Sequence, residues 1–228
     1  MKPYYEHAGI TIYHGDCREI LPLLEGVDSV ITDPVWPNCG ERRLRGADRP
    51  WELFAEAASL FAPLTQRAVI WLGCDSDPRF LVGMPRGLPF FRVCWLEYAF
   101  PTPKGRLLYS GDVAYAFGRP VPSLPGLRLI GGRYLSARSD VRHLALVKHK
   151  EWGKPMPNEH PTPRRLQFAR FLVKRFSAGR VLDPFMGSGT TLRAAKELGR
   201  EAIGIEIEER YCEIAAKRLA QEVLSFTE

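Results

Sequence analysis

The segment at residues 181–191 constrains the fold of this 228-residue chain more than any other. An apolar pair leads into Asp183, and Gly187 and Gly189 follow before a helix-like run that starts at Thr191. Glycine accepts positive φ angles and lets a ligand approach the backbone closely. In α/β folds, a strand, a tight loop and a helix in this order hold nucleotide-like cofactors at the carboxyl ends of the strands. The segment therefore predicts an α/β fold with a site for a small ligand.

The loop does not match the two common phosphate-binding motifs. A P-loop needs a Lys directly before its Ser or Thr, whereas Thr190 and Thr191 follow Gly189 with no Lys. A dinucleotide fingerprint, G-x-G-x-x-G, needs a third glycine, and Leu192 stands in its place. The pattern therefore fits neither of these phosphate-binding classes.

Hydrophobic spacing along the rest of the chain alternates between strand-like and helix-like runs. Strands are predicted at residues 10–13, 27–32, 68–72, 91–100, 112–117, 181–183 and 201–207, and helices at 18–24, 51–61, 163–177, 191–198 and 208–224. This alternation predicts a doubly wound, mostly parallel α/β sheet. Residues 101–105 are expected to join two strands in an antiparallel hairpin at the edge of the sheet. Trp71 and Trp95, which lie in two predicted strands, are expected in the core.

Length and composition limit the class of protein. The chain suits one domain, residues 1–228, because a chain of this size buries roughly 70% of its unfolded surface. No apolar run approaches a membrane span and the first residues lack a signal-peptide core, so we expect a cytoplasmic protein with no membrane partner. The five cysteines are scattered without a C-x-x-C pair, which predicts neither a disulfide framework nor a metal site.

Basic charge is concentrated in residues 119–154, which hold eight Lys or Arg residues and two acidic residues. The net charge of this stretch, +6, equals that of the entire chain. Such a concentration is typical of a surface that binds a polyanion, although a solvated Arg-rich surface has the same composition. Hydrophobic periodicity is also lost over residues 118–158, which are predicted to be a basic insertion. Residues 37–50 carry four more arginines and are predicted to be a long loop.

Two motifs carry a resemblance to a known family. Asp183-Pro184-Phe185-Met186-Gly187-Ser188-Gly189-Thr190 resembles the D-P-F-x-G-S-G-T loop of the DNA amino-methyltransferases, which receives the methionine part of S-adenosylmethionine. Asp33-Pro34-Val35-Trp36 resembles their catalytic motif D-P-P-Y/W. The catalytic motif precedes the cofactor loop by about 150 residues, as in the β group of the family. The resemblance thus implies the Rossmann-like methyltransferase fold in its circularly permuted form.

Three further segments match the family's cofactor site. His160-Pro161-Thr162-Pro163 resembles the segment that starts the helix before the cofactor loop, in which Thr162 would bind the methionine end. Glu206 ends a strand 23 positions after Asp183 and would accept both ribose hydroxyls. Asp16, in Gly15-Asp16-Cys17, would accept a hydrogen bond from the cofactor adenine, besides capping a short helix. The residues that the resemblance assigns to S-adenosylmethionine are Asp16, Cys17, Asp33, His160, Thr162, Asp183, Phe185, Gly187, Ser188, Gly189, Thr190, Thr191, Glu206 and Ile207.

The chemistry of the reaction explains the catalytic motif. The exocyclic amine of adenine is a weak nucleophile because its lone pair is delocalised into the ring. A carboxylate and a backbone carbonyl that accept its two N–H bonds would direct that lone pair at the methyl group, so Asp33 and the carbonyl of Pro34 are the candidate catalytic groups. Trp36 would stack on the target base once it is flipped out of the duplex. Val35 departs from the family's second proline, which gives the loop back an N–H group and conformational freedom.

The sequence is therefore interpreted as an S-adenosylmethionine-dependent DNA methyltransferase. Asp at the start of the catalytic motif favours the N6 amine of adenine as the target. Alternative interpretations are cytosine N4 or RNA as the substrate, and a nucleic-acid-binding pseudoenzyme that lost turnover through Val35. The small insertion favours a short DNA site or recognition shared across a homodimer, and a partner restriction enzyme is left open. The residues expected to contact DNA are Arg42, Arg43, Arg45, Arg128, Arg133, Arg138 and Arg142.

Overall fold

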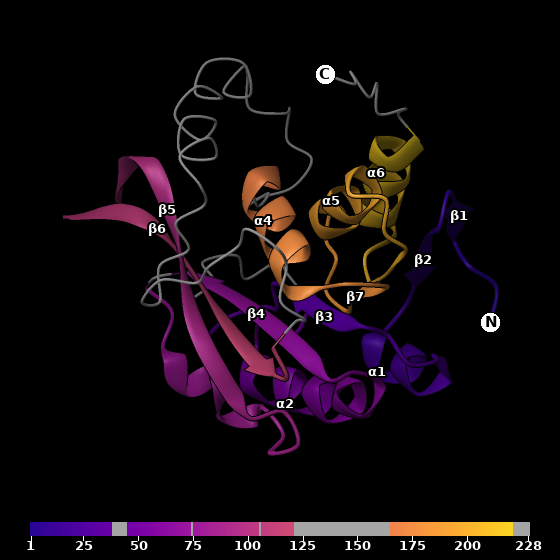
Figure 1. The fold of residues 1–228 in the computed structure, drawn as a ribbon, viewed down its shortest axis with the longest axis horizontal. Helices are drawn as coiled ribbons and strands as arrows, with labels where there is room; N and C mark the ends of the chain where they lie inside the picture. Colours follow the sequence, from indigo (N-terminus) through magenta and orange to yellow (C-terminus); the bar gives the residue numbers. More distant parts are fainter. Residues whose placement is uncertain (38–44, 74, 105, 121–164, 221–228) are drawn as a thin grey trace.

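The described strands form one twisted sheet of eight strands (Figure 1). The computed structural model describes residues 1–37, 45–73, 75–104, 106–120 and 165–220. The strand order is β1-β2-β8-β7-β3-β4-β6-β5. The strands from β2 to β4 in this order run parallel, whereas β1 pairs antiparallel at one edge and β6 and β5 pair antiparallel at the other. The predicted doubly wound, mostly parallel sheet with an edge hairpin is confirmed.

The strands and helices follow the predicted alternation along the chain. In sheet order the strands are β1 Tyr5–His7, β2 Ile10–His14, β8 Ala202–Glu206, β7 Val181–Asp183, β3 Ser29–Thr32, β4 Arg67–Gly73, β6 Leu107–Gly118 and β5 Phe90–Lys104. The α-helices are α1 Cys17–Ile20, α2 Pro50–Phe61, α4 Leu166–Phe176, α5 Thr190–Glu197 and α6 Glu209–Ala220. Short 3₁₀ turns are η1 Leu21–Leu23, η2 Ala62–Leu64 and η3 Pro78–Gly83. Neither β1 nor η3 was predicted.

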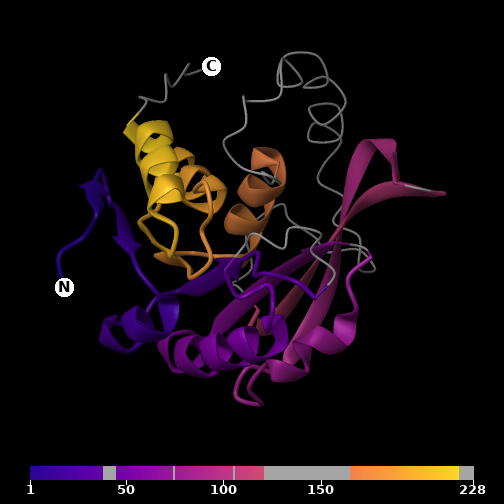
Figure 2. The same ribbon diagram turned by 180° about the vertical axis from the view of Figure 1, so that it is seen from behind.

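Helices cover both faces of the sheet (Figures 1 and 2). Helices α4, α5 and α6 lie on one face, and α1 and α2 lie on the other. Alternate residues of the central strands supply the two cores, because successive side chains of a strand point to opposite faces. Ile31, for example, packs in the cluster with α4, whereas its neighbour Val30 packs in the cluster with α2. The parallel strands are therefore buried on both sides, as such strands require.

The edge hairpin is longer than predicted. Residues 101–104, predicted to be part of the connection, belong to β5, and the pairing with β6 continues to Lys104 and Leu107. A register shift between the pairs at Glu97 and Thr102 lets the two strands continue past the irregularity. Pro101 and Pro103 are tolerated because β5 is the outer strand, where one side needs no N–H donor.

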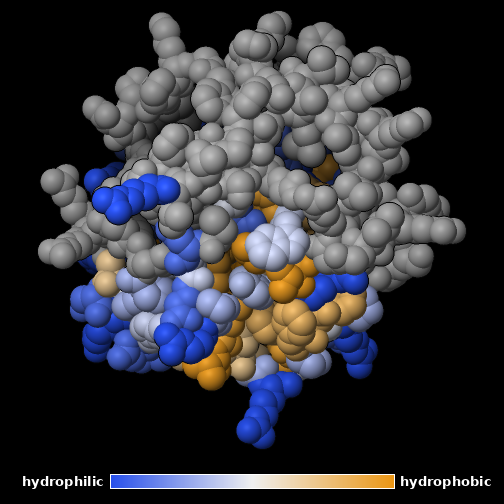
Figure 3. All heavy atoms as spheres, turned by 90° about the vertical axis from the view of Figure 1, so that its left-hand side faces the viewer, coloured by the Kyte–Doolittle hydropathy of each residue, from blue (hydrophilic) through white to orange (hydrophobic). Residues whose placement is uncertain are grey.

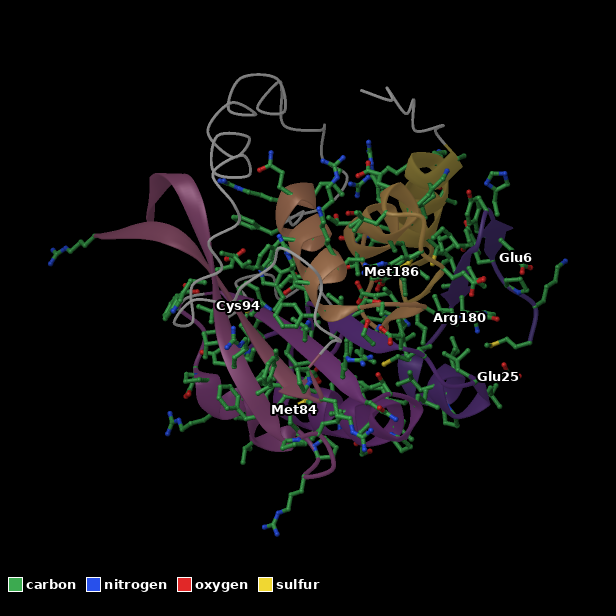
Figure 4. All side chains as sticks on the ribbon, viewed as in Figure 1. Glu6, Glu25, Met84, Cys94, Arg180 and Met186 are labelled. Carbon is green, nitrogen blue, oxygen red and sulfur yellow. The ribbon has the colours of Figure 1, made fainter. Side chains whose placement is uncertain are left out.

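The prediction that both Trp71 and Trp95 lie in the core is wrong for Trp95. Trp71 is buried at 2% exposure, as predicted, but Trp95 is 53% exposed. Its neighbours Cys94, labelled in Figure 4, and Leu96 face the core from the outer strand, so period two places Trp95 on the opposite face. Figure 3 shows hydrophobic residues among charged ones on the hairpin side of the molecule. No helix within the described residues is long and apolar enough to cross a membrane.

Candidate active site

The carboxyl ends of four neighbouring strands bring the predicted site residues to one edge of the sheet. The strand order β2-β8-β7-β3 brings Asp16, Glu206, Asp183 and Asp33 to one edge, each at or just after the end of its strand. The strand β3, which precedes the predicted catalytic motif, comes before β7, which precedes the predicted cofactor loop, and this is the permuted order. This edge, between the two groups of helices, is where open α/β sheets bind their ligands.

Two glycines form the tight turn between β7 and α5. Gly187 and Gly189 have φ angles of 50° and 77°, which only glycine adopts readily. The Met186 N–H donates to the Ile205 carbonyl at 3.1 Å, so the turn is hydrogen-bonded to β8. Beneath it lies Gly204, where an added Cβ would lie 2.4 Å from the sulfur of Met186, a residue labelled in Figure 4. The turn is thus held against β8 with no room for a larger residue.

The Glu206 carboxylate lies at the mouth of this turn. One oxygen accepts the Gly187 N–H at 2.9 Å, and the other accepts the Glu208 N–H at 2.8 Å. Burial raises the pKa of this carboxyl, and the two backbone hydrogen bonds counter that rise. A carboxylate has about four acceptor positions, so two backbone donors leave capacity for two hydroxyl groups. This geometry fits a diol such as the cofactor ribose.

Asp183 is a buried link between the cofactor strand and the catalytic strand. Its side chain is 2% exposed and its Oδ1 accepts the Thr32 hydroxyl at 2.7 Å and the Phe185 N–H at 3.2 Å. Burial raises the pKa of Asp183 to about 7, and the charge of Asp33 adds to this rise. The carboxyl therefore joins β3 to β7 and shapes the start of the turn.

Ser188 faces away from the mouth of the site. It is 5% exposed, and both its carbonyl and its hydroxyl accept from the Arg218 guanidinium, at 2.6 and 2.9 Å. Arg218 lies on α6 and reaches the turn from behind. Thr190 and Thr191, at the start of α5, are each 7% exposed. The N–H groups of Met186, Gly187 and Gly189 are paired within the protein. The donors that a helix start offers a ligand are therefore those of the first turn of α5.

Asp16 caps α1 as predicted and is also held by a neighbouring cation. Its Oδ1 accepts the Arg18 N–H at 2.9 Å, and the Arg18 guanidinium contacts both carboxylate oxygens, the shortest contact being 2.6 Å. Arg18 also donates to Glu56 of α2 at 2.7 Å. The hydrogen bond from Arg18 lowers the pKa of Asp16, so this acceptor stays ionised near neutral pH.

The catalytic tetrapeptide follows β3 without regular secondary structure. The indole N–H of Trp36 donates to Oδ1 of Asp33 at 2.8 Å. Pro34 is buried, and the other three residues are partly exposed. Trp36 and Phe185 both pack against the core cluster that contains α2. The loop at residues 33–36 and the turn after β7 therefore pack against the same apolar core cluster.

Several predicted residues have other surroundings or lie outside the description. Cys17 is a buried thiol whose pKa burial raises to about 12, and the Ile207 carbonyl lies 3.2 Å from Nε2 of His14. Arg45 pairs with Glu208 at 3.2 Å, which joins the Arg-rich loop to the end of β8. The predicted residues outside the described ones are His160, Thr162, Arg42, Arg43, Arg128, Arg133, Arg138 and Arg142.

Sequence reasoning missed three residues that support the site. Thr32 looked like an ordinary strand residue, but its hydroxyl joins the two motifs. Arg18 had one signal, its position two residues after a helix cap. Arg218 had none, because a basic residue in a closing helix is typical of a solvated surface. Within the described residues there is no group of three or more metal-ligating side chains placed to hold an ion.

Comparison with known proteins decides the family. The family model N6_N4_Mtase, described as DNA methylase, matches residues 50–217. The chain belongs to this DNA methylase family. The chain is also similar to type II methyltransferases over most of its length. M.HinfI of Haemophilus influenzae is 58% identical over 256 aligned residues, covering 92% of this chain and 68% of the relative. M.ScaI of Streptomyces caespitosus is 53% identical over 272 aligned residues, covering 98% of this chain and 86% of the relative.

A solved structure shows the same fold. The M1.HpyAVI–SAM complex superposes with a TM-score of 0.63 at 24% identity, covering 93% of this chain and 100% of the other. The DNA methylase fold thus accounts for the sheet order and for the position of the two motifs. Residues 33–36 precede the part of the chain that the family model matches.

Proposed function

We propose that this DNA methylase transfers a methyl group from S-adenosylmethionine to the N6 amine of an adenine in DNA. The observation that carries the proposal is the placement of the catalytic loop beside the cofactor turn. The loop follows β3, the turn follows the neighbouring strand β7, and the Thr32–Asp183 hydrogen bond joins the two strands at 2.7 Å. A bound cofactor and a bound base would therefore meet above these two strand ends.

The residues at the carboxyl edge fit S-adenosylmethionine. Glu206 retains acceptor capacity for two hydroxyls, and the ionised Asp16 can accept from the amine of an adenine ring. The N–H groups of the first turn of α5 suit the carboxylate of the cofactor's methionine part. When bound, the cofactor supplies a methyl group on a positively charged sulfur. Thr162 and His160 are proposed to complete its methionine site.

Asp33 and the carbonyl of Pro34 are proposed to accept the two N–H bonds of the target amine. This arrangement holds the amine and directs its lone pair without a covalent intermediate. A base within a duplex cannot reach Asp33, so the target must be flipped out. The partly exposed Trp36 ring would then stack on the base and offset part of the cost of flipping. Asp at position 33 favours adenine over cytosine N4.

The basic insertion at 118–158 and the loop after Trp36 are proposed to grip the DNA phosphates and read the bases. The exposed side chain of Arg45, which pairs with Glu208 just after the end of β8, supports this proposal. The similarity to type II methyltransferases supports a role as the modification enzyme of a restriction–modification system in the cytoplasm. A short recognition site or a homodimer would suit an insertion of this size.

The deciding experiment is incubation of the purified protein with tritiated S-adenosylmethionine and genomic DNA that lacks methylated adenine. We expect tritium in N6-methyladenine after nucleoside analysis, and none with the Asp33→Ala variant. Calorimetric titration with S-adenosylmethionine should show that this variant still binds the cofactor.

Other outcomes identify the alternatives. Label in N4-methylcytosine would show that the target base is cytosine. Label that appears only with RNA would show that the substrate is RNA. No label with either substrate, together with intact cofactor binding, would establish a pseudoenzyme.

A further inference from the structure

The catalytic carboxylate is held by a side chain of its own loop. The indole N–H of Trp36 donates to Oδ1 of Asp33 at 2.8 Å, in a partly buried setting. This contact joins the first and fourth residues of the tetrapeptide and closes a ring across Pro34 and Val35. The hydrogen bond is charge-assisted, and bonds of this kind are among the stronger ones in proteins.

The backbone of the loop restrains the Asp33 carboxylate only in part. Residues 33–36 belong to no helix or strand. Pro34 fixes its own φ and restricts the backbone of Asp33, but Val35, unlike the family's second proline, leaves the φ of residue 35 unrestricted by a ring. An Asp side chain also rotates broadly about its last torsion, so an unrestrained carboxylate would spread over several orientations.

Trp36 is itself well anchored. Its ring packs on the core cluster beside α2, to which Phe185 of the cofactor turn also belongs. Because the ring is fixed against this core cluster, its N–H group also fixes the position of the Asp33 carboxylate. The orientation of Asp33 is then set relative to the cofactor turn, which is the relation that in-line methyl transfer requires.

We propose that Trp36 is a positioning residue for Asp33, and that its indole N–H supplies the restraint that Val35 omits. This role is separate from stacking on the flipped base, since stacking needs the ring and positioning needs the N–H. The proposal rests on Asp33 being the acceptor of the target amine, as proposed above. It predicts that the chemical step, rather than cofactor or DNA binding, depends on the N–H group.

The test separates the N–H from the ring. Trp36→Phe keeps an aromatic face without a donor, and replacement of Trp36 by 3-benzothienylalanine keeps the two-ring shape with sulfur in place of N–H. Both variants should lower kcat about tenfold, in line with the loss of one hydrogen bond to a charged group. The KM for DNA should change less than about threefold with benzothienylalanine, because stacking is retained. Calorimetric affinity for S-adenosylmethionine and the thermal midpoint serve as controls for folding.

The second arm tests the link to Val35. Val35→Pro should restore backbone restraint, so in that background the loss caused by Trp36→Phe should shrink to about threefold or less. Full kcat with benzothienylalanine in place of Trp36 would overturn the proposal. An equal loss in the Val35 and Pro backgrounds would also overturn the compensating role of the N–H. The wild-type reaction reports on the proposed function independently, since its failure would appear before any Trp36 variant is made.

Discussion

At the scale of single residues, Arg218 stands out because it holds the turn between β7 and α5 from the neighbouring helix α6. Its guanidinium donates to both the carbonyl and the hydroxyl of Ser188. Burial lowers the pKa of Arg218 and nearby Arg193 lowers it further, while Glu197 raises it. The guanidinium thus supplies a hydrogen-bond donor to the Ser188 carbonyl, which the sharp turn does not pair with a backbone N–H group. The turn therefore depends on a residue 30 positions away.

Arg218→Leu should weaken the binding of S-adenosylmethionine roughly tenfold to a hundredfold, the worth of a hydrogen bond from a charged donor. Arg218→Lys should recover part of this loss because one donor and the charge remain. Calorimetric titration measures both affinities. Lys217→Leu is the matched control, since the side chain of this neighbour on α6 is 74% exposed and forms a surface ion pair with Glu213 at 2.7 Å. Equal affinities for Arg218→Leu and Lys217→Leu would contradict the prediction.

The buried carboxyl of Asp183 should make stability depend on pH. Its pKa rises from an ordinary 3.8 to about 7 in the folded protein, chiefly through burial. Between these values the native state binds more protons than the unfolded state, so the free energy of unfolding falls as pH rises through this window. The stability that protonated Asp183 contributes is fully present below about pH 4 and is lost above about pH 7.

Asp183→Asn should remove this fall in the free energy of unfolding between about pH 4 and pH 7. We expect the wild type to lose about 2–4 kcal/mol relative to the variant between about pH 4 and pH 7, as the size of the shift implies. Urea unfolding at several pH values measures the difference, and unchanged slopes against urea would show that the same surface is exposed. Asp16 and Asp28, whose pKa values are lowered, act in the opposite direction in both proteins and cancel in the comparison. Parallel pH curves for the two proteins would refute the assignment.

At the scale of elements, β8 supports the cofactor turn only because it carries Gly204. An added Cβ would lie 2.4 Å from Sδ of Met186 and 2.7 Å from Cδ2 of Leu192. Gly204→Ala should therefore lower the free energy of unfolding by about 1–3 kcal/mol through overpacking, and should displace the turn. Gly87→Ala is the control, because a Cβ there meets nothing within 4 Å. Urea unfolding of both variants is the measurement, and equal stabilities would show that the turn yields easily.

The elements that the sequence predicted well are those with strong periodicity or a clear end signal. The strand before Asp183, the helix after Gly189 and the strand that ends at Glu206 are all within a few residues of their predicted bounds. The edge hairpin was harder to predict, because prolines in an outer strand resemble a connecting loop. Trp95 was misplaced for a related reason: an apolar residue in an edge strand has no second layer to cover it.

The residues of the candidate site also divide into those that the sequence could place and those that it could not. Motif residues such as Asp33, Glu206 and Asp16 could be placed at one sheet edge because parallel strands align their carboxyl ends. The contacts that hold them could not be predicted. Thr32 reaches Asp183 across 151 positions, and no local pattern marks a hydroxyl that finds its acceptor on another strand.

At the scale of the whole molecule, the excess of basic charge should govern binding to DNA. Affinity for a short duplex should fall steeply with salt, because each neutralised phosphate releases counterions. Joint replacement of Arg128, Arg133, Arg138 and Arg142 by Gln should reduce the slope of log K against log salt by up to about four, while leaving affinity for S-adenosylmethionine unchanged. Fluorescence anisotropy with labelled duplex measures the slope. A slope equal to that of the wild type would place the DNA contacts elsewhere.

The strand order also governs when the protein can become functional during its synthesis. Strands β7 and β8 are made late, yet they lie between β2 and β3, which are made early. A nascent chain that ends before residue 181 thus has a gap in the middle of its sheet, with two strand edges unpaired. Such long-range pairing folds slowly, and the sheet edge that carries Asp183 and Glu206 can form only after β7 and β8 have left the ribosome. The newly made enzyme would be catalytically silent until then.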